Sequence, residues 1–183
     1  MSNPDLTGVL LVGGLSRRFG SVKALATLGP ETLAERAWRV LGEACGQRLA
    51  VGKEADQLGL SFPVQDDGTS VRAPLAGVVA GLREAPTEVS VFLPVDCPVM
   101  TAEALQALGA ACADAAVSQT GPLPGAYSRS ALPTLEERLV RGELALHEAL
   151  DELETRVVEL DEALLQNVNT ERELDRLRSS VRV

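Results

Sequence analysis

Basic and glycine residues are concentrated in one short stretch near the N-terminus. The stretch covers residues 13–23, GGLSRRFGSVK, and includes Gly13, Gly14, Ser16, Arg18 and Lys23. Between residues 6 and 30 the chain has three basic residues and no acidic one, although its formal net charge is −9. Glycine lets the backbone approach a ligand closely, and successive backbone amides form a concavity that attracts anions. The stretch therefore predicts a phosphate-binding loop, and the alternative is a glycine-rich turn with solvated basic side chains.

Two common phosphate-binding motifs do not fit this stretch. A Walker loop requires G-x-x-x-x-G-K-[ST], whereas here the lysine follows Ser21 and Val22 and precedes Ala24. A dinucleotide-binding fingerprint requires G-x-G-x-x-G, whereas the first two glycines here are adjacent. The loop therefore belongs to another class of phosphate site.

A second candidate for chemistry follows the most continuous β-type run of the chain, residues 89–94 (VSVFLP). Asp96 lies just beyond this run. Open α/β sheets bind ligands outside the carboxyl ends of their strands, so a carboxylate at this place is suited to hold a metal ion. The structural alternative is that Asp96 caps the next helix. Thr101 stands directly before that helix and is the better cap, which leaves Asp96 for chemistry.

The C-terminal region supplies a candidate partner for Asp96. Residues 166–170 read QNVNT and precede a predicted helix over residues 171–178, with Thr170 and Glu173 at the spacing of a capping box. Mg²⁺ takes one or two protein carboxylates and fills its shell with phosphates and water. The neutral carbonyl of Asn169 is thus a candidate second ligand. The alternative is that Asn167 and Asn169 are turn or capping residues.

These residues need a scaffold of alternating strands and helices. The apolar run over residues 9–12 predicts a buried strand that ends at the glycine loop, and the helical spacing over residues 31–45 predicts a helix with Trp38 in the core. Further strands are expected at residues 48–52, 62–65, 89–94, 114–118, 123–127 and 156–160, and further helices at residues 73–84, 101–113, 130–141, 143–153 and 171–178. The alternation predicts an α/β fold with a buried, mostly parallel sheet.

Composition narrows the class of protein. The 183 residues are 45% hydrophobic but 3% aromatic, so one domain over residues 1–183 with a core of Leu, Val and Ala is expected. No apolar run reaches the roughly 20 residues that span a bilayer and the N-terminus lacks a signal-peptide pattern, so a cytoplasmic protein is expected. With a pI near 4.7 the chain should bind neither nucleic acid nor an anionic membrane.

The sequence has three cysteines, Cys45, Cys97 and Cys112. Their spacing does not match that of metal ligands, so they are expected to be free, buried thiols.

Four segments together carry a resemblance to a known family. The N-terminal loop resembles the signature L-x-G-G-x-S-x-R-x-G-x-x-K of nucleotidyltransferases that activate sugars, polyols and pterins. Three further segments follow in order: APLAGV at residues 73–78, LPVDCP at 93–98 and NVNTERELDRL at 167–177. With these landmarks over nearly its whole length, the chain resembles the MobA-type molybdenum cofactor guanylyltransferases.

This resemblance implies a fold, a reaction and a set of site residues. The implied fold is a three-layer α/β/α, Rossmann-like fold of the nucleotide-diphospho-sugar transferase type, with GTP and Mg²⁺ at the strand ends. The implied reaction joins GMP to the terminal phosphate of molybdopterin and releases pyrophosphate. The matching positions are Leu11, Val12 and Gly13 for guanine and ribose, Gly14 and Ser16 for the nucleotide, Lys23 and Arg18 for the triphosphate, Asp96 for magnesium, and Asp67 for a further nucleotide contact, for which Asp66 competes.

The chemistry agrees with these roles. A phosphate monoester is already a nucleophile at neutral pH, so positioning and charge neutralisation suffice, and a metal ion with Lys and Arg can supply both. Two features depart from the family pattern: Gly52 stands where an asparagine is expected, and the stretch after Gly142, ELALHEAL, is not basic. The alternatives are a related enzyme that uses CTP or a sugar or polyol phosphate, and a non-catalytic nucleotide-binding regulator.

Overall fold

A mostly parallel β-sheet forms the centre of the protein. The computed structural model describes residues 1–13, 22–53, 56 and 58–180. Within these residues the sheet has seven strands in the order β5-β4-β1-β6-β8-β7-β9. They are β1 (Asn3–Leu11), β4 (Cys45–Gly52), β5 (Gln65–Asp66), β6 (Val89–Pro94), β7 (Ala115–Ser118), β8 (Gly121–Ser128) and β9 (Thr155–Val158). Every neighbouring pair is parallel except the two that β8 makes with β6 and β7.

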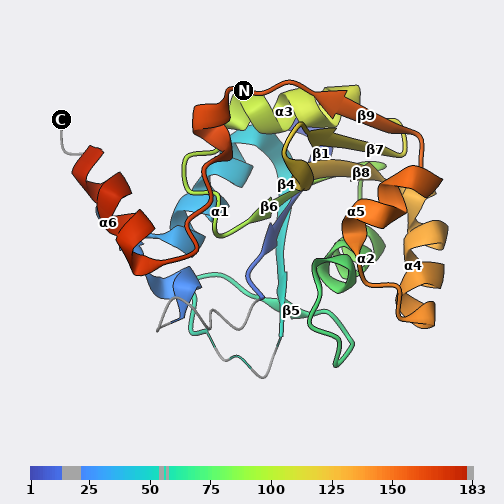
Figure 1. Cartoon of the computed structure of the whole chain (residues 1–183), viewed down its shortest axis with the longest axis horizontal. Coiled ribbons are helices and arrows are strands. Elements are labelled where there is room, and N and C mark those ends of the chain that lie inside the picture. Colours follow the sequence, from blue (N-terminus) through green and yellow to red (C-terminus); the bar gives the residue numbers. More distant parts are fainter. Residues whose placement is uncertain (14–21, 54–55, 57, 181–183) are drawn as a thin grey trace.

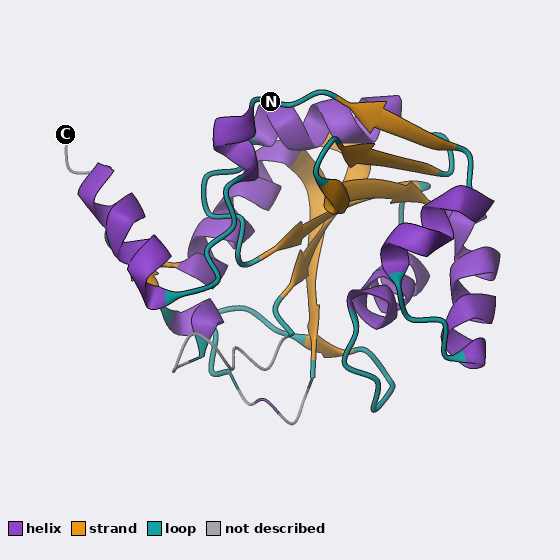
Figure 2. Ribbon diagram, viewed as in Figure 1, coloured by secondary structure: helices purple, strands orange, loops and turns teal. Residues whose placement is uncertain are grey.

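Helices cover both faces of this sheet, which gives three layers (Figures 1 and 2). On one face lie α1 (Leu33–Ala44) and α3 (Ala102–Ala111), and on the other lie α2 (Pro74–Glu84), α4 (Leu132–Arg141) and α5 (Leu146–Ala149). Side chains alternate along each strand, so β1 directs Leu10 toward α1 and α3 and Val9 toward α2. The predicted three-layer α/β/α fold is confirmed.

Local hydrogen bonds set where the helices begin. The Thr32 hydroxyl accepts the backbone N–H of Glu35 at 3.1 Å, and the Glu35 carboxylate accepts the N–H of Thr32 at 2.9 Å, so a capping box starts α1. The Thr101 hydroxyl accepts the N–H of Ala104 at 3.3 Å and caps α3, as the sequence predicted. Asp96 is therefore not the cap of this helix.

The C-terminal helix α6 (Glu171–Ser180) packs away from the sheet (Figure 1). Thr170 and Glu173 form the predicted capping box at its start, with hydrogen bonds of 2.9 and 3.3 Å. The helix lies against the two-stranded sheet of β2 (Thr27–Leu28) and β3 (Glu31–Thr32), and Arg178 donates to the carbonyl of Thr27. A small apolar cluster anchors it, formed by Leu28, Leu33, Val168 and Leu174.

Three details differ from the sequence predictions. The strand expected over residues 62–65 is instead the two-residue β5, Gln65–Asp66. Phe62 lies before it and is buried in a stack with Trp38, with ring centroids 4.3 Å apart. Trp38 is half-buried rather than in the core, and Arg48 lies over its ring. The helix expected over residues 143–153 begins only at Leu146, as α5, and continues as a 3₁₀ turn at Leu150–Glu152. Gly142, in the left-handed conformation, ends α4, and residues 143–145 are not helical.

All three cysteines are free, as predicted; Cys45 and Cys97 are buried and Cys112 is half-buried. Among the helices that the structure describes, none is both long and apolar enough to cross a membrane.

Close packing of α2 on the sheet gives a test of the fold. A Cβ at Gly81 would lie 2.6 Å from Cε1 of Phe92 and 2.8 Å from Cγ1 of Val9, and both of these side chains are fully buried. We expect Gly81→Ala to lower the free energy of unfolding by about 1–3 kcal/mol, because the core must shift to accept the methyl group. Urea unfolding followed by circular dichroism measures this change.

The matched control is Gly42→Ala in α1. Its added Cβ would meet the guanidinium of Arg48, which is the far end of a flexible side chain. Alanine also gains up to about 1 kcal/mol over glycine in a helix interior. We therefore expect a clearly smaller loss for Gly42→Ala, and equal losses for the two variants would contradict the packing argument.

Candidate active site

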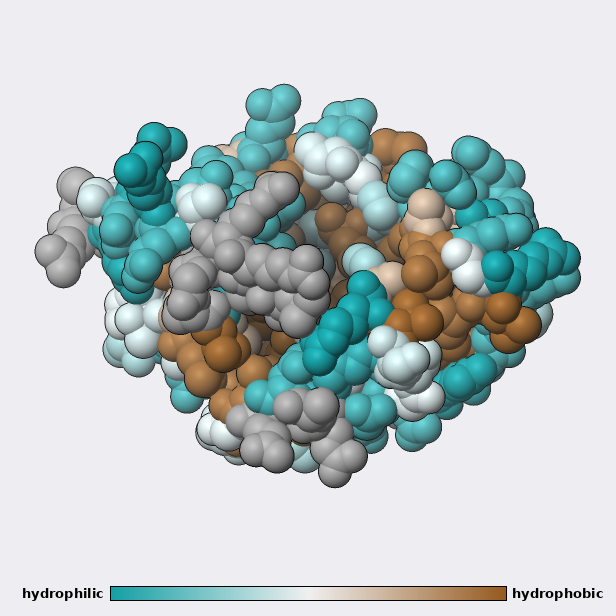
Figure 3. Space-filling view, turned by 60° about the horizontal axis from the view of Figure 1, so that its bottom comes forward, coloured by the Kyte–Doolittle hydropathy of each residue, from teal (hydrophilic) through white to brown (hydrophobic). Residues whose placement is uncertain are grey.

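A cavity of about 1160 Å³ opens at the edge of the sheet where β1, β4, β5 and β6 end. The four strands are parallel, so their carboxyl ends lie together at this edge. Figure 3 brings this edge forward and shows a hollowed surface where hydrophobic and hydrophilic side chains meet. Ligands of open α/β sheets bind at such an edge.

The floor of the cavity is formed where β1 and β4 end. Leu11, Val12 and Gly13 line it, as the sequence predicted, and Gly52 lies beside them. A Cβ at Gly52 would stand 2.8 Å from Cγ2 of Val12 and 3.1 Å from Cγ1 of Val64. The side chains of Val12 and Val64 thus occupy the space that a side chain at position 52, such as the expected asparagine, would need.

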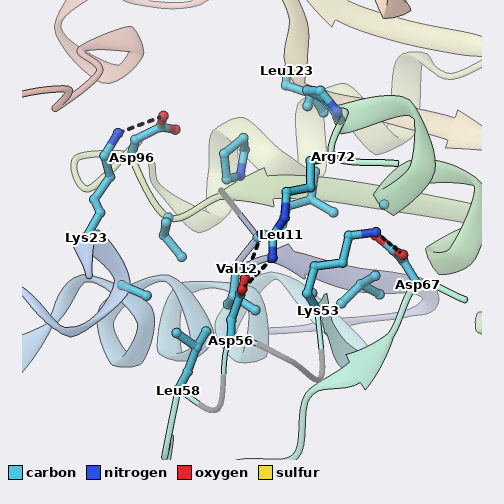
Figure 4. Close-up of a pocket in the computed structure, with 18 of the residues that line it drawn as sticks. Leu11, Val12, Lys23, Lys53, Asp56, Leu58, Asp67, Arg72, Asp96 and Leu123 are labelled. Atoms are coloured by element: carbon cyan, nitrogen blue, oxygen red, sulfur yellow. Dashed lines mark hydrogen bonds and ion pairs between the residues drawn. The ribbon is translucent and has the colours of Figure 1, made fainter. Parts of the chain in front are cut away.

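Lys23 and Asp96 line one end of the cavity, and Asn169 contacts Lys23 there. The Lys23 ammonium lies 3.4 Å from Asp96 Oδ2 and donates a hydrogen bond to Asn169 Oδ1 at 3.1 Å. The two side chains of the ion pair are 13% and 28% exposed, so the pair is accessible to a ligand (Figure 4). Three residues far apart in the sequence, all predicted for this site, are thus brought together.

The segment before α6 forms a clasp, residues 167–169, over the end of β6. The backbone N–H of Val168 donates to the Asp96 carbonyl at 2.8 Å, and the Cys97 thiol donates to Asn167 Oδ1 at 3.0 Å. The side chains of Asn167 and Asn169 therefore face the strand end, while Thr170 caps the helix. The hydroxyl of Thr170, and neither asparagine side chain, accepts the N–H of Glu173 at the start of the helix, while the backbone N–H of Asn169 donates to the Glu173 carboxylate.

Lys53 and Asp67 form a second charged pair at the other end of the cavity. The Lys53 ammonium lies 2.5 Å from Asp67 Oδ1 and 2.5 Å from the Thr69 carbonyl oxygen. Both side chains are less than a tenth exposed. Asp67 lines the cavity, whereas Asp66 is exposed and accepts the N–H of Gly68 within the turn. Of the two competing aspartates, the structure places Asp67 at the site.

A third charged pair, Arg72 and Asp56, also lines the cavity. The guanidinium donates to both carboxylate oxygens, at 2.8 and 3.2 Å. Lys53, Asp56 and Arg72 were not predicted from the sequence. Lys53 carried a usable signal, since it directly follows the carboxyl end of a predicted strand; the other two lie in a connection without a motif.

Several predicted residues lie outside the described part of the chain. These are Gly14, Ser16 and Arg18 of the phosphate loop. For this loop the structure describes its two ends, Gly13 and the residues from Val22 onward, and both line the cavity.

Cys97 lines the cavity next to Asp96, and its environment keeps the thiol protonated. Burial raises the pKa of the Cys97 thiol, and the neighbouring Asp96 carboxylate raises the pKa further because a second negative charge would be repelled. A thiol reacts as a nucleophile through its thiolate. The Cys97 thiol therefore serves as a hydrogen-bond donor to the clasp and is not poised for covalent catalysis.

Comparison with known proteins places this site in a family. The model of the MobA-like NTP transferase domain matches residues 8–157 of the chain. The chain belongs to this family of nucleotidyltransferases. The matched segment contains the loop, the strand ends and Asp96.

Individual relatives agree with this assignment. A molybdenum cofactor guanylyltransferase of Burkholderia ambifaria is 33% identical over 155 residues, which cover 78% of this chain and 74% of the relative. A second protein of the same name, from Desulfosudis oleivorans, is 26% identical, and the alignment covers 97% of this chain and 96% of that protein. The crystal structure of molybdopterin-guanine dinucleotide biosynthesis protein A from Archaeoglobus fulgidus superposes with a TM-score of 0.81 at 24% identity, covering 96% of this chain and 98% of the other. At that identity the superposition establishes the fold.

The protonated state of Cys97 can be tested by alkylation. We expect Cys97 in the folded protein to react with iodoacetamide at pH 8 on the order of 10²-fold more slowly than in the urea-unfolded chain, because its thiolate is scarce. Mass spectrometry of tryptic peptides at a series of times gives the rate at each cysteine. Cys112 is the internal comparison, since it is half-buried and should react faster. Labelling of Cys97 at the rate of the unfolded chain would identify an activated nucleophile instead.

Proposed function

We propose that the protein is a molybdenum cofactor guanylyltransferase that transfers GMP from GTP to the terminal phosphate of molybdopterin. The observation that carries the proposal is the meeting of Lys23, Asp96 and Asn169 at the carboxyl edge of the sheet, beside the basic loop. Relatives that match nearly the whole chain bear the name of this activity. The two substrates are GTP and molybdopterin.

The proposed reaction exchanges one phosphoryl bond for another. An oxygen of the acceptor phosphate bonds to the α-phosphorus of GTP, while the bond from that phosphorus to the bridging oxygen breaks. The electron pair of the broken bond leaves with pyrophosphate. The acceptor phosphate is already ionised at neutral pH, so no proton needs to be removed from it. The protein must align the two phosphates and offset their negative charge, and such positioning in a preorganised field is a large part of enzymatic rate enhancement.

Lys23 is suited to the charge-offsetting role. Its ammonium is a point charge on a flexible stem, and its contacts include the anionic oxygen of Asp96 and the neutral oxygen of Asn169. A triphosphate offers stronger acceptors at the same place, so the ammonium can move onto the α-phosphate. The guanidinium fork of Arg18, from the same loop, would hold two phosphate oxygens at once.

The residues at this end also fit Mg²⁺. Asp96 supplies an anionic oxygen and Asn169 a neutral one, and both already converge on a single cation, the Lys23 ammonium. Mg²⁺ prefers oxygen ligands of this kind and takes the remaining ones from phosphates and water. We therefore propose Asp96 and Asn169 as its protein ligands. When bound, the ion would neutralise charge on the phosphate oxygens.

A substrate assay tests the function directly. Purified protein is incubated with Mg²⁺, molybdopterin and GTP, CTP, ATP or UTP in turn, and the dinucleotide product and pyrophosphate are measured. We expect product with GTP and pyrophosphate release that depends on molybdopterin. Faster turnover with CTP, or with a sugar phosphate as acceptor, would assign a related transferase, and GTP binding without turnover would assign a regulator.

Asp96→Asn tests the metal role. The change keeps the shape of the side chain and removes its charge, and the ion pair it breaks is partly exposed and contributes at most about 1 kcal/mol. We expect a melting temperature near that of the original protein and a turnover lower by on the order of 10²-fold or more, with a higher Mg²⁺ requirement. Turnover is measured across a Mg²⁺ titration.

The control for this experiment is Asp114→Asn. Asp114 precedes β7 and therefore lies at the opposite edge of the sheet, where it accepts hydrogen bonds from Ser130 and from the N–H of Glu154. This variant should keep its turnover and its Mg²⁺ requirement. Normal turnover of Asp96→Asn at low Mg²⁺ would overturn the metal assignment.

A further inference from the structure

Helix α6 is hydrogen-bonded to the segment that carries Lys23. Lys23 begins a 3₁₀ turn, Lys23–Leu25, and the N–H of Ala26 donates to the Lys23 carbonyl at 3.0 Å. The next residue, Thr27, begins β2. Arg178 of α6 reaches this point, since its Nε and Nη2 groups both donate to the Thr27 carbonyl, at 3.0 and 2.7 Å. The last helix of the chain therefore holds the backbone directly after the turn of Lys23.

An apolar cluster connects the same segment to the clasp over Asp96. The cluster is formed by four buried residues from β2, α1, the clasp and α6: Leu28, Leu33, Val168 and Leu174. The backbone N–H of Val168 also donates to the Asp96 carbonyl at 2.8 Å. Contacts of α6 thus extend to both sides of the Lys23–Asp96 ion pair, to one side through β2 and to the other through the clasp.

The two kinds of contact restrain the Lys23 segment differently. Burial of apolar surface holds the cluster together but is not directional, so it permits small sliding movements of β2 against α6. A guanidinium is planar and directs its donors along fixed lines. Nη1 of Arg178 donates to Asp175 Oδ1 at 2.7 Å, while the other two donors converge on the Thr27 carbonyl. Arg178 therefore supplies a directional restraint that the cluster alone does not provide.

We propose that Arg178 is a positioning residue for nucleotidyl transfer and that it acts through Lys23. It fixes the turn of Lys23 relative to the clasp, and hence the place of the ammonium relative to Asp96 and the α-phosphate. Arg178 is not among the described residues that line the cavity, so its effect is indirect. A misplacement of about 1 Å at a reacting group can cost on the order of 10²-fold in rate. This inference rests on the proposed function, because it assumes that Lys23 acts on the α-phosphate of GTP.

Arg178→Met tests the restraint, because methionine keeps an unbranched stem and lacks the donors. We expect kcat with GTP and molybdopterin to fall on the order of tenfold, and the Kd for GTP with Mg²⁺ to change by less than about twofold, since Lys23 offsets charge that develops in the transition state. Turnover is measured by product formation and Kd by calorimetry, at a temperature at which melting curves show every variant folded. The matched control is Arg176→Met, which removes an exposed arginine from the same helix and should keep its kcat.

Two further experiments distinguish positioning from anchoring of the helix. Arg178→Lys retains a cationic donor for the Thr27 carbonyl and should turn over faster than Arg178→Met. Lys23→Ala should lower kcat on the order of 10²-fold. Adding Arg178→Met to Lys23→Ala should cause no further loss, because residues that act as a unit have non-additive effects.

The outcomes separate the inference from the function on which it rests. If the original protein transfers no GMP to molybdopterin, the proposed function fails and the inference fails with it. If transfer occurs and folded Arg178→Met keeps the original kcat, the inference is overturned and the function stands. Losses that multiply in the double variant would also overturn it, because Arg178 would then act independently of Lys23. The same holds if Arg176→Met is equally slow, or if Arg178→Lys is no faster than Arg178→Met.

Discussion

The parallel pairing of β1 with β6 is the constraint on which the site depends. The two strands stay in register as far as Leu11 and Pro94, and the N–H of Val95 still donates to the Leu11 carbonyl at 3.3 Å. Beyond this point both segments leave the sheet at the same edge, one into the basic loop and the other to Asp96. A cationic segment and a carboxylate that are far apart in sequence therefore meet, and Lys23 closes the contact.

Charge balance explains how a strongly acidic chain can offer a site for a triphosphate. The described residues that line the cavity include the cations Lys23, Lys53 and Arg72 and the carboxylates Asp56, Asp67 and Asp96. Each cation has an acidic partner within the cavity wall, so no buried charge is left uncompensated when the ligand is absent. An anionic ligand that binds these cations must compete with their acidic partners in the cavity wall.

Local signals in the sequence predicted the fold well, and long-range contacts account for what they missed. The caps at Thr101 and Thr170 and the run ending at Pro94 are properties of neighbouring residues, and the structure contains all three. The antiparallel direction of β8 could not be predicted from the spacing of apolar residues, because that spacing identifies a strand but not its orientation. The Lys53–Asp67 pair likewise depends on β4 lying beside β5, and neither residue type alone indicates it.

The clasp over Asp96 shows that the site is completed from the far end of the chain. Asn169 is 146 residues from Lys23 in sequence, yet the two side chains are hydrogen-bonded. The position of Asn169 depends on the capping box that follows it and on the apolar cluster in which Val168 and Leu174 pack. The family match ends at residue 157, so it contains Lys23 and Asp96 but not this clasp. Docking of α6 therefore links the packing of the C-terminal segment to the geometry of the phosphate end.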